Sequence, residues 1–310
     1  MNLEQLRGFV EIARLGHFTR ASEHLHLAQP SLSRQISTLE RELGTELFHR
    51  ARGHITLTAS GDALLPRAQR MLAEAEAIRE EMGELAGLRR GRVRLGAPPT
   101  LCISLVAEAI STFHSSHPGV DLHLIESGSR ALVEQLAIGA VDIALITESD
   151  GPPPSGFSLT RTPLLTEELV VVSAASRAPI AVTPSIGLDY LATLPLIALD
   201  ETYELRAATD AAFRSAGLTP NHVLEGAEMD AVLRFVERGI GVAVVPAMVL
   251  LDQPALRSVR LTHPMMTRVV SLAHRSDVTP AVAVAAMRDV ILSTAVEVAH
   301  RDPAITSLLD

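Results

Sequence analysis

Hydrogen-bonding side chains recur at close spacing between residues 29 and 38, in the run QPSLSRQIST. If this run is helical, Leu32, Ile36 and Leu39 fall on one inward face. The outward face then carries amide, hydroxyl and guanidinium groups, those of Gln29, Ser31, Ser33, Arg34, Ser37 and Thr38. Glutamine pairs with adenine, arginine with guanine, and hydroxyl groups with phosphate or with either base. These side chains therefore predict a surface that contacts double-stranded DNA, although a solvated helix face is the simpler interpretation of any one of them.

Three helices and a hairpin are predicted to position this surface. Apolar residues at helical spacing indicate a first helix over residues 2–15, which ends at Gly16, and a second helix with Thr19 as its N-cap. Pro30 fits the first turn of the third helix, where a missing N–H has no intrahelical partner. The run LFHRARGHITLT then predicts two short strands around a turn, a wing from which Arg50 and Arg52 reach a DNA backbone or a narrow minor groove. This order is that of a winged helix-turn-helix.

A long amphipathic helix is predicted next, from Thr58 as its N-cap to about Leu88. Its apolar residues are spaced alternately by four and three, which is typical of a coiled-coil seam. The seam consists of Leu64, Ala68, Met71, Ala75, Ile78, Met82 and Leu85. Polar residues flank this narrow stripe, which favours pairing with a second chain over packing on the helix's own domain.

Alternating strands and helices follow residue 92. The segments VRLGA, VDLHLIE and VDIALI predict strands with two helices between them, which indicates a parallel βαβαβ sheet. A second set, ELVVVS, PLIALD and VAVVP with two further helices, predicts another α/β lobe. The segment RVVSLA and a helix over residues 281–298 are expected to return to the first sheet. The result is two lobes with a crevice between them.

The crevice is the predicted site for a small molecule, because ligands of open α/β sheets bind where strands end and helices begin. Free N–H groups and hydroxyls at residues 97–100 and 127–129 favour an oxyanion such as a small carboxylate. Two prolines and nearby acidic residues leave an amine or a polyol as the rival. The candidate contacts are Pro99, Thr100, Leu101, Ser127, Ser129, Thr147, Glu148, Asp200 and Met229. For the last four, loop polarity or core packing is an equally good interpretation.

The single cysteine, Cys102, falls in a first helical turn, where the helix dipole is expected to lower the pKa of its thiol. A redox sensor normally needs a second cysteine, so a packed thiol is favoured. The pair of His24 and His26 lacks a third ligand, and no metal site is predicted.

Composition narrows the function classes. The net charge is −9, but residues 1–94 hold 14 Arg and 12 acidic residues, whereas residues 95–310 hold 13 and 24. The amino-terminal part is therefore the plausible polyanion-binding face. All 27 basic residues are Arg, which excludes lysine-dependent phosphate loops and Schiff bases. No nucleophile elbow, zinc-protease or C-x-x-C motif occurs, so we expect neither an enzyme nor a cofactor. The absence of a signal peptide and of a long apolar run predicts a cytoplasmic protein that contacts no membrane.

The run FTRASEHLHLAQPSLSRQISTLERELGTELFHR, followed by ITLTASG, closely resembles the amino-terminal module of LysR-type transcriptional regulators. The resemblance implies an α+β winged helix-turn-helix head, residues 1–58, and a linker and dimerisation helix, residues 59–91. It also implies an α/β effector domain like type 2 periplasmic binding proteins, residues 92–310, with lobe 1 over 92–161 and 266–300 and lobe 2 over 162–265. The resemblance carries DNA contact onto Gln29, Pro30, Ser33 and Arg34. Ala28 departs from it, because many members have a capping Ser or Thr there.

These observations predict a sequence-specific regulator of transcription that forms a homodimer or homotetramer. Its partners would be a DNA operator, a small effector, a second copy of the chain and RNA polymerase. Closure of the lobes would change the spacing of paired heads and hence DNA bending. One alternative is a ligand-independent architectural DNA binder, which leaves the acidic, crevice-forming remainder unexplained. Another is a solute-binding protein or an enzyme, which needs an export signal or a catalytic constellation.

Overall fold

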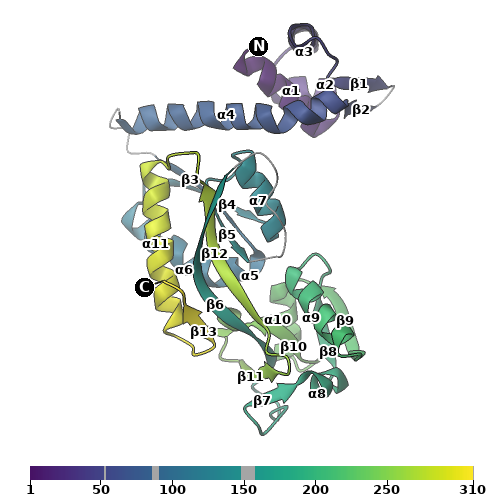
Figure 1. The fold of residues 1–310 in the computed structure, drawn as a ribbon, viewed down its shortest axis with the longest axis vertical. Coiled ribbons are helices and arrows are strands. Elements are labelled where there is room, and N and C mark those ends of the chain that lie inside the picture. Colours follow the sequence, from purple (N-terminus) through teal and green to yellow (C-terminus); the bar gives the residue numbers. More distant parts are fainter. Residues whose placement is uncertain (52–53, 86–90, 148–157, 310) are drawn as a thin grey trace. The chain divides into compact units, whose positions relative to one another are not determined.

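The computed structural model describes residues 1–51, 54–85, 91–147 and 158–309 (Figure 1). The chain divides into two units, residues 1–91 with 134–141 and residues 92–133 with 142–310. Each unit has its own cluster of buried apolar side chains.

The head begins with three helices, α1 (Leu3–Leu15), α2 (Phe18–His24) and α3 (Gln29–Leu43). Asn2 and Gln5 exchange side-chain and backbone hydrogen bonds at the start of α1, which satisfies two free N–H groups. The predicted N-cap of α2 is wrong: the carbonyl of His17 accepts the first helical bond, from the N–H of Ala21, so that Thr19 lies inside the first turn.

The inward faces of the helices meet as their periodicity predicts. Leu32, Ile36 and Leu39 of α3 are fully buried against α1. Gly8 permits this approach, because a Cβ at that position would lie 2.7 Å from Cδ1 of Leu32. Strands β1 (Phe48–Ala51) and β2 (His54–Leu57) pair antiparallel as the predicted wing.

Helix α4 (Ala59–Leu85) follows, and the hydroxyl of Thr58 caps it by accepting from the N–H of Gly61 at 3.1 Å. The predicted seam divides in two along this helix. Its first members, Leu64 and Ala68, pack on the core of the head. The later apolar members are exposed, by 44% for Met71, 52% for Ile78 and 52% for Met82. The predicted extension to Leu88 lies outside the described residues.

The second unit is built on a sheet of nine strands. Strand β3 (Arg92–Ala97) pairs parallel with β4 (Asp121–Glu126) and with β5 (Ile143–Thr147), which confirms the predicted βαβαβ arrangement. Between them lie α5 (Pro99–Leu101), the π-helix η1 (Cys102–Val106), α6 (Ala107–Ser116) and α7 (Ser129–Ala137). The return of the chain is also confirmed: β12 (Thr267–Arg275) pairs antiparallel with β5, and α11 (Val282–Ala299) packs on β3 and α6.

Strand β6 (Leu159–Ala174) is 16 residues long and joins both lobes. Residues 159–168 pair with β12, and residues 165–167 also pair with β13 (Ile305–Ser307). Residues 169–174 pair with β10 (Ala243–Pro246) and β11 (Leu256–Thr262). The predicted boundary between residues 161 and 162 therefore falls inside one continuous strand.

The rest of lobe 2 surrounds a two-stranded parallel sheet of β8 (Leu196–Leu199) and β9 (His222–Ala227). Its other elements are β7 (Ser185–Gly187), α8 (Leu188–Thr193), α9 (Glu204–Ser215), α10 (Met229–Glu237) and the 3₁₀ helix η2 (Ala247–Leu250). Helices α9 and α10 begin shortly after β8 and β9, so their amino termini lie at the carboxyl ends of these strands.

Candidate functional site

The outward face of α3 carries the predicted DNA contacts. Gln29, Pro30 and Arg34 are exposed, and Ser31, Ser33 and Thr38 are half-buried. The Nε of Arg34 donates to the carbonyl of Pro30 at 3.3 Å, so the guanidinium lies along the first turn. Of the predicted wing residues, Arg52 lies outside the described residues, and only the backbone of Arg50, in β1, is described.

The first turn of α3 partly compensates for the missing cap. Ala28 precedes the helix without a side-chain hydrogen bond. Its carbonyl accepts from the N–H groups of Ser31, at 2.8 Å, and Leu32, at 3.2 Å, while Pro30 has no N–H to satisfy. Fewer free donors remain than in an ordinary first turn, so the missing cap costs less than the usual value of about 1 kcal/mol.

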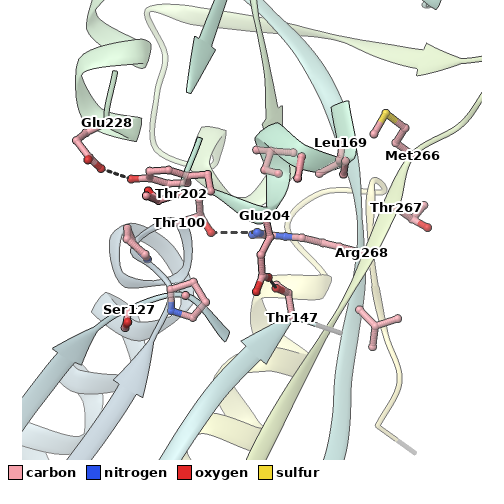
Figure 2. A pocket seen from close by; sticks show the side chains of 18 residues that line it. Thr100, Ser127, Thr147, Leu169, Thr202, Glu204, Glu228, Met266, Thr267 and Arg268 are labelled. Atoms are coloured by element: carbon pink, nitrogen blue, oxygen red, sulfur yellow. Dashed lines mark hydrogen bonds between the residues drawn. The ribbon is translucent and has the colours of Figure 1, made fainter. Parts of the chain in front are cut away.

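A cavity of about 970 Å³ lies between the two lobes of the second unit (Figure 2). Of the nine predicted contacts, four line it: Pro99, Thr100, Ser127 and Thr147. Leu101 and Met229 are buried in the core, and the buried Ser129 lies directly behind Thr147. Asp200 is half-buried and does not line the cavity, and Glu148 lies outside the described residues.

A carboxylate from lobe 2 binds the hydroxyls of lobe 1. Oε2 of Glu204, the first residue of α9, accepts from the hydroxyl of Thr147 at 2.6 Å and from that of Ser129 at 3.1 Å. The Oγ of Ser129 also accepts from the backbone N–H of Thr147 at 3.0 Å. Both hydroxyls are buried. Because they bind the carboxylate of Glu204, this side chain occupies the position at which the sequence predicts a carboxylate of the effector.

A buried ion pair lies at another wall of the cavity. The Nε of Arg268 donates to Oε1 of Glu167 at 2.7 Å, and its Nη1 donates to the hydroxyl of Thr100 at 3.0 Å. Its Nη2 lies 2.7 Å from the same Glu167 oxygen, but it is buried without a hydrogen bond among the described residues. Oε2 of Glu167 accepts from the backbone N–H of Met248 at 3.0 Å. Through its bonds to Thr100 of lobe 1 and to Met248 of lobe 2, the ion pair connects the two lobes at the wall of the cavity.

Lobe 2 contributes a second acid to the lining. The hydroxyl of Tyr203 donates to Oε2 of Glu228, a residue labelled in Figure 2. Burial, followed by this bond, raises the pKa of Tyr203. Outside the lining, the backbone N–H and hydroxyl of Thr202 donate to Asp200 and lower its pKa.

The expected activation of Cys102 is wrong. Burial, followed by the charge of Glu126, raises the pKa of the thiol from 9.0 to about 12. The sulfur lies 3.7 Å from the carbonyl of Ala97, in a π-helical turn. Desolvation of the thiolate therefore outweighs the helix dipole at this position.

Sequence reasoning missed Glu204, Glu228 and Arg268. The two acids were detectable by the same rule that selected Ser127 and Ser129, because Glu204 begins α9 and Glu228 directly precedes α10, each after a strand end. Arg268 offered no such signal, since its contact with Thr100 joins residues 168 positions apart.

Across the described ranges, no group of three or more His, Cys, Asp or Glu side chains is arranged to hold a metal ion. In the same part of the chain, no helix combines the length and apolar character needed to cross a membrane.

Comparisons with known proteins give consistent results. Residues 3–62 match the model of the bacterial regulatory helix-turn-helix protein, lysR family, and residues 86–295 match that of the LysR substrate binding domain. The chain is 34% identical over 273 residues to the uncharacterized HTH-type transcriptional regulator YybE of Bacillus subtilis, covering 88% of this chain and 92% of that protein. It is 30% identical over 245 residues to the HTH-type transcriptional regulator CfxR of Cupriavidus necator, covering 79% and 75%. A full-length OxyR variant from Pseudomonas aeruginosa superposes with a TM-score of 0.68 at 26% identity, covering 95% of this chain and 94% of that one.

Proposed function

The chain belongs to the LysR family of DNA-binding transcriptional regulators, and on that premise we propose that it binds a specific operator through α3 under the control of a small molecule in the cavity of its second unit. The proposed head spans residues 1–58, the linker helix 59–91 and the effector domain 92–310. The proposed partners are the operator, the effector, a second copy of the chain and RNA polymerase. The relatives named above are regulators, and we propose no catalytic role.

The outward face of α3 is the observation that carries the proposal. Gln29 and Arg34 are exposed at its amino-terminal end, the part of a recognition helix that meets base edges in the major groove. Ser33 and Thr38 extend this face with hydroxyls suited to phosphate oxygens. The opposite face is fixed by its buried leucine and isoleucine side chains, so the polar groups are held on a rigid support.

We further propose that α4 pairs with a second copy of the chain. Leu64 and Ala68 are engaged by the head itself, so the proposed contact begins beyond them. It consists of Met71, Ala75, Ile78, Met82 and Leu85. The exposed fractions of three of these side chains support this, because large apolar groups rarely lie in a row on a free surface. Pairing of the effector domains as well would give the predicted tetramer.

The proposed effector lies in the cavity against Pro99, Thr100, Ser127 and Thr147. The hydroxyls of Thr100 and Ser127 support the oxyanion that the sequence predicts. The bonds of Thr147 and Ser129 to Glu204 oppose it, because these donors are already used.

Fluorescence anisotropy tests the DNA-binding function. We expect the full chain to prefer DNA from upstream of its own gene over a scrambled duplex at the same salt concentration. Arg34→Ala removes a contact of the kind worth about 1–3 kcal/mol, so the preference should fall roughly 5- to 150-fold. Arg7→Ala is the matched control, because it removes an equal charge from α1, where Arg7 pairs with Glu4. Equal, strongly salt-dependent binding to both duplexes would instead support an architectural DNA binder.

A further inference from the structure

The cavity already contains a carboxylate where an anionic effector was predicted. Oε2 of Glu204 takes the hydroxyl hydrogens of Thr147 and Ser129, and its bonds cross from lobe 2 to lobe 1. An effector carboxylate at this position would lose those donors and would also face the negative charge of Glu204. Like charges at contact distance repel, so this end of the cavity disfavours an anion.

The one cationic side chain among the described lining residues is neutralised. Arg268 forms its ion pair with Glu167, whose side chain is completely buried. The remaining unbonded nitrogen, Nη2, is itself buried and out of reach of a ligand. Arg268 therefore supplies no net positive charge to the cavity.

The two acids of the lining are not neutralised in this way. Oε1 of Glu204 and Oε1 of Glu228 accept no hydrogen bond within the described part of the chain. Both residues stand at helix amino termini, each equivalent to roughly half a positive charge, which offsets only part of each carboxylate. Tyr203 directly precedes Glu204 and donates to Glu228, so one residue of lobe 2 connects the two acids that line the cavity.

We propose that the effector of this chain carries a protonated amine or guanidinium group that binds the carboxylates of Glu204 and Glu228. The proposal rests on the proposed function, because it takes the cavity as the effector site. The ring of Tyr203, which also lines the cavity, adds an aromatic surface suited to a cation. The apolar lining residues Leu169, Met266 and Val269 are suited to the carbon chain of such a ligand.

Isothermal titration calorimetry on the full chain tests this with probes that differ in charge. Putrescine, butanediol and succinate share a four-carbon chain and are cationic, neutral and anionic, and agmatine adds a guanidinium. We expect putrescine or agmatine to bind, and butanediol and succinate not to bind. Glu204→Gln keeps an acceptor for the two hydroxyls but removes the charge, and it should weaken binding about tenfold or more. Glu228→Gln should weaken it similarly.

Glu201→Gln is the matched control, since it removes the same charge from an exposed acid that does not line the cavity. Binding of succinate without binding of the amines would overturn the proposal. So would the failure of both amines to bind, or an unchanged affinity in both glutamine variants. Operator binding is measured on the same preparations, and circular dichroism checks their fold. If neither amine binds while the unmodified chain still prefers its operator, only the proposed effector class is refuted. If the unmodified chain shows no preference for its operator, the proposed function is refuted.

Discussion

Replacement of Glu167 by alanine is expected to destabilise the second unit by about 3 kcal/mol, the lower end of the range for breaking a buried ion pair. The side chain of Glu167 is 0% exposed, and it accepts hydrogen bonds from Arg268 and from the backbone of Met248. Alanine leaves the guanidinium without its counter-charge. Because the side chain of Arg268 is 14% exposed, partial hydration should keep the loss from reaching the upper end of that range.

A double variant separates the charge from the hydrogen bonds. With Glu167→Met and Arg268→Met together, no unpaired charge remains, and apolar groups of similar length fill the space. The N–H of Met248 still loses its acceptor, which costs about 1–3 kcal/mol for a buried donor. The double variant should therefore be destabilised less than Glu167→Ala, but not restored fully.

Tyrosine fluorescence during urea unfolding measures this unit separately. The chain has no tryptophan and two tyrosines, Tyr190 and Tyr203, both in the second unit. The midpoint and slope of the transition give the free energy of unfolding. A loss below about 1 kcal/mol for Glu167→Ala, or a double variant less stable than the single one, would refute the reasoning.

Three further predictions concern other parts of the chain. Gly61→Ala should lower the thermal midpoint of the head, because the added Cβ would lie 2.3 Å from the carbonyl oxygen of Leu47. This holds although alanine is the better helix former by about 1 kcal/mol. Thermal unfolding followed by circular dichroism measures the midpoint, and an unchanged value would contradict the prediction. Cys102 should be alkylated slowly by iodoacetamide near neutral pH, with a rate that rises until about pH 12, and Glu126→Gln should accelerate it. Because its folded pKa is raised, the thiol stabilises the fold fully below about pH 9 and loses this contribution as the pH rises to about 12; rapid alkylation at neutral pH would argue against burial. Ile78→Asp should shift the chain towards monomers in sedimentation equilibrium, and an unchanged mass would remove α4 from the proposed interface.

The sequence predicted correctly those elements whose apolar residues recur at regular spacing or in continuous runs. The spacing of Leu32, Ile36 and Leu39 identified α3, and the apolar runs of β3, β4 and β5 identified the parallel part of the sheet. Strand β6 was predicted only in its last part, because Pro163 and three polar residues at 166–168 interrupt the apolar pattern. One of those polar residues, Glu167, is buried, and its partners Met248 and Arg268 lie far from it in the sequence. A pattern of neighbouring residues cannot predict such burial.

The seam of α4 shows a second limit of pattern reasoning. Its spacing is the same at Ala68 and at Ile78, yet one packs on the head and the other is exposed. Periodicity defines which side of a helix is apolar, but not whether a neighbouring part of the chain or another molecule covers it. The cavity shows the same limit, because Glu204 and Thr147 are brought together only by the meeting of the two lobes.

Strand β13 has a consequence for the order in which the chain folds. Residues 305–307 pair with residues 165–167, and pairings between such distant segments form slowly. During synthesis the sheet of the second unit stays incomplete until residues 305–307 have emerged from the ribosome. Helices α1 to α4 and the wing, by contrast, lie within residues 1–85, and the other segment of their unit, residues 134–141, also comes long before β13 in the chain. The head is therefore able to form before the sheet of the second unit is complete.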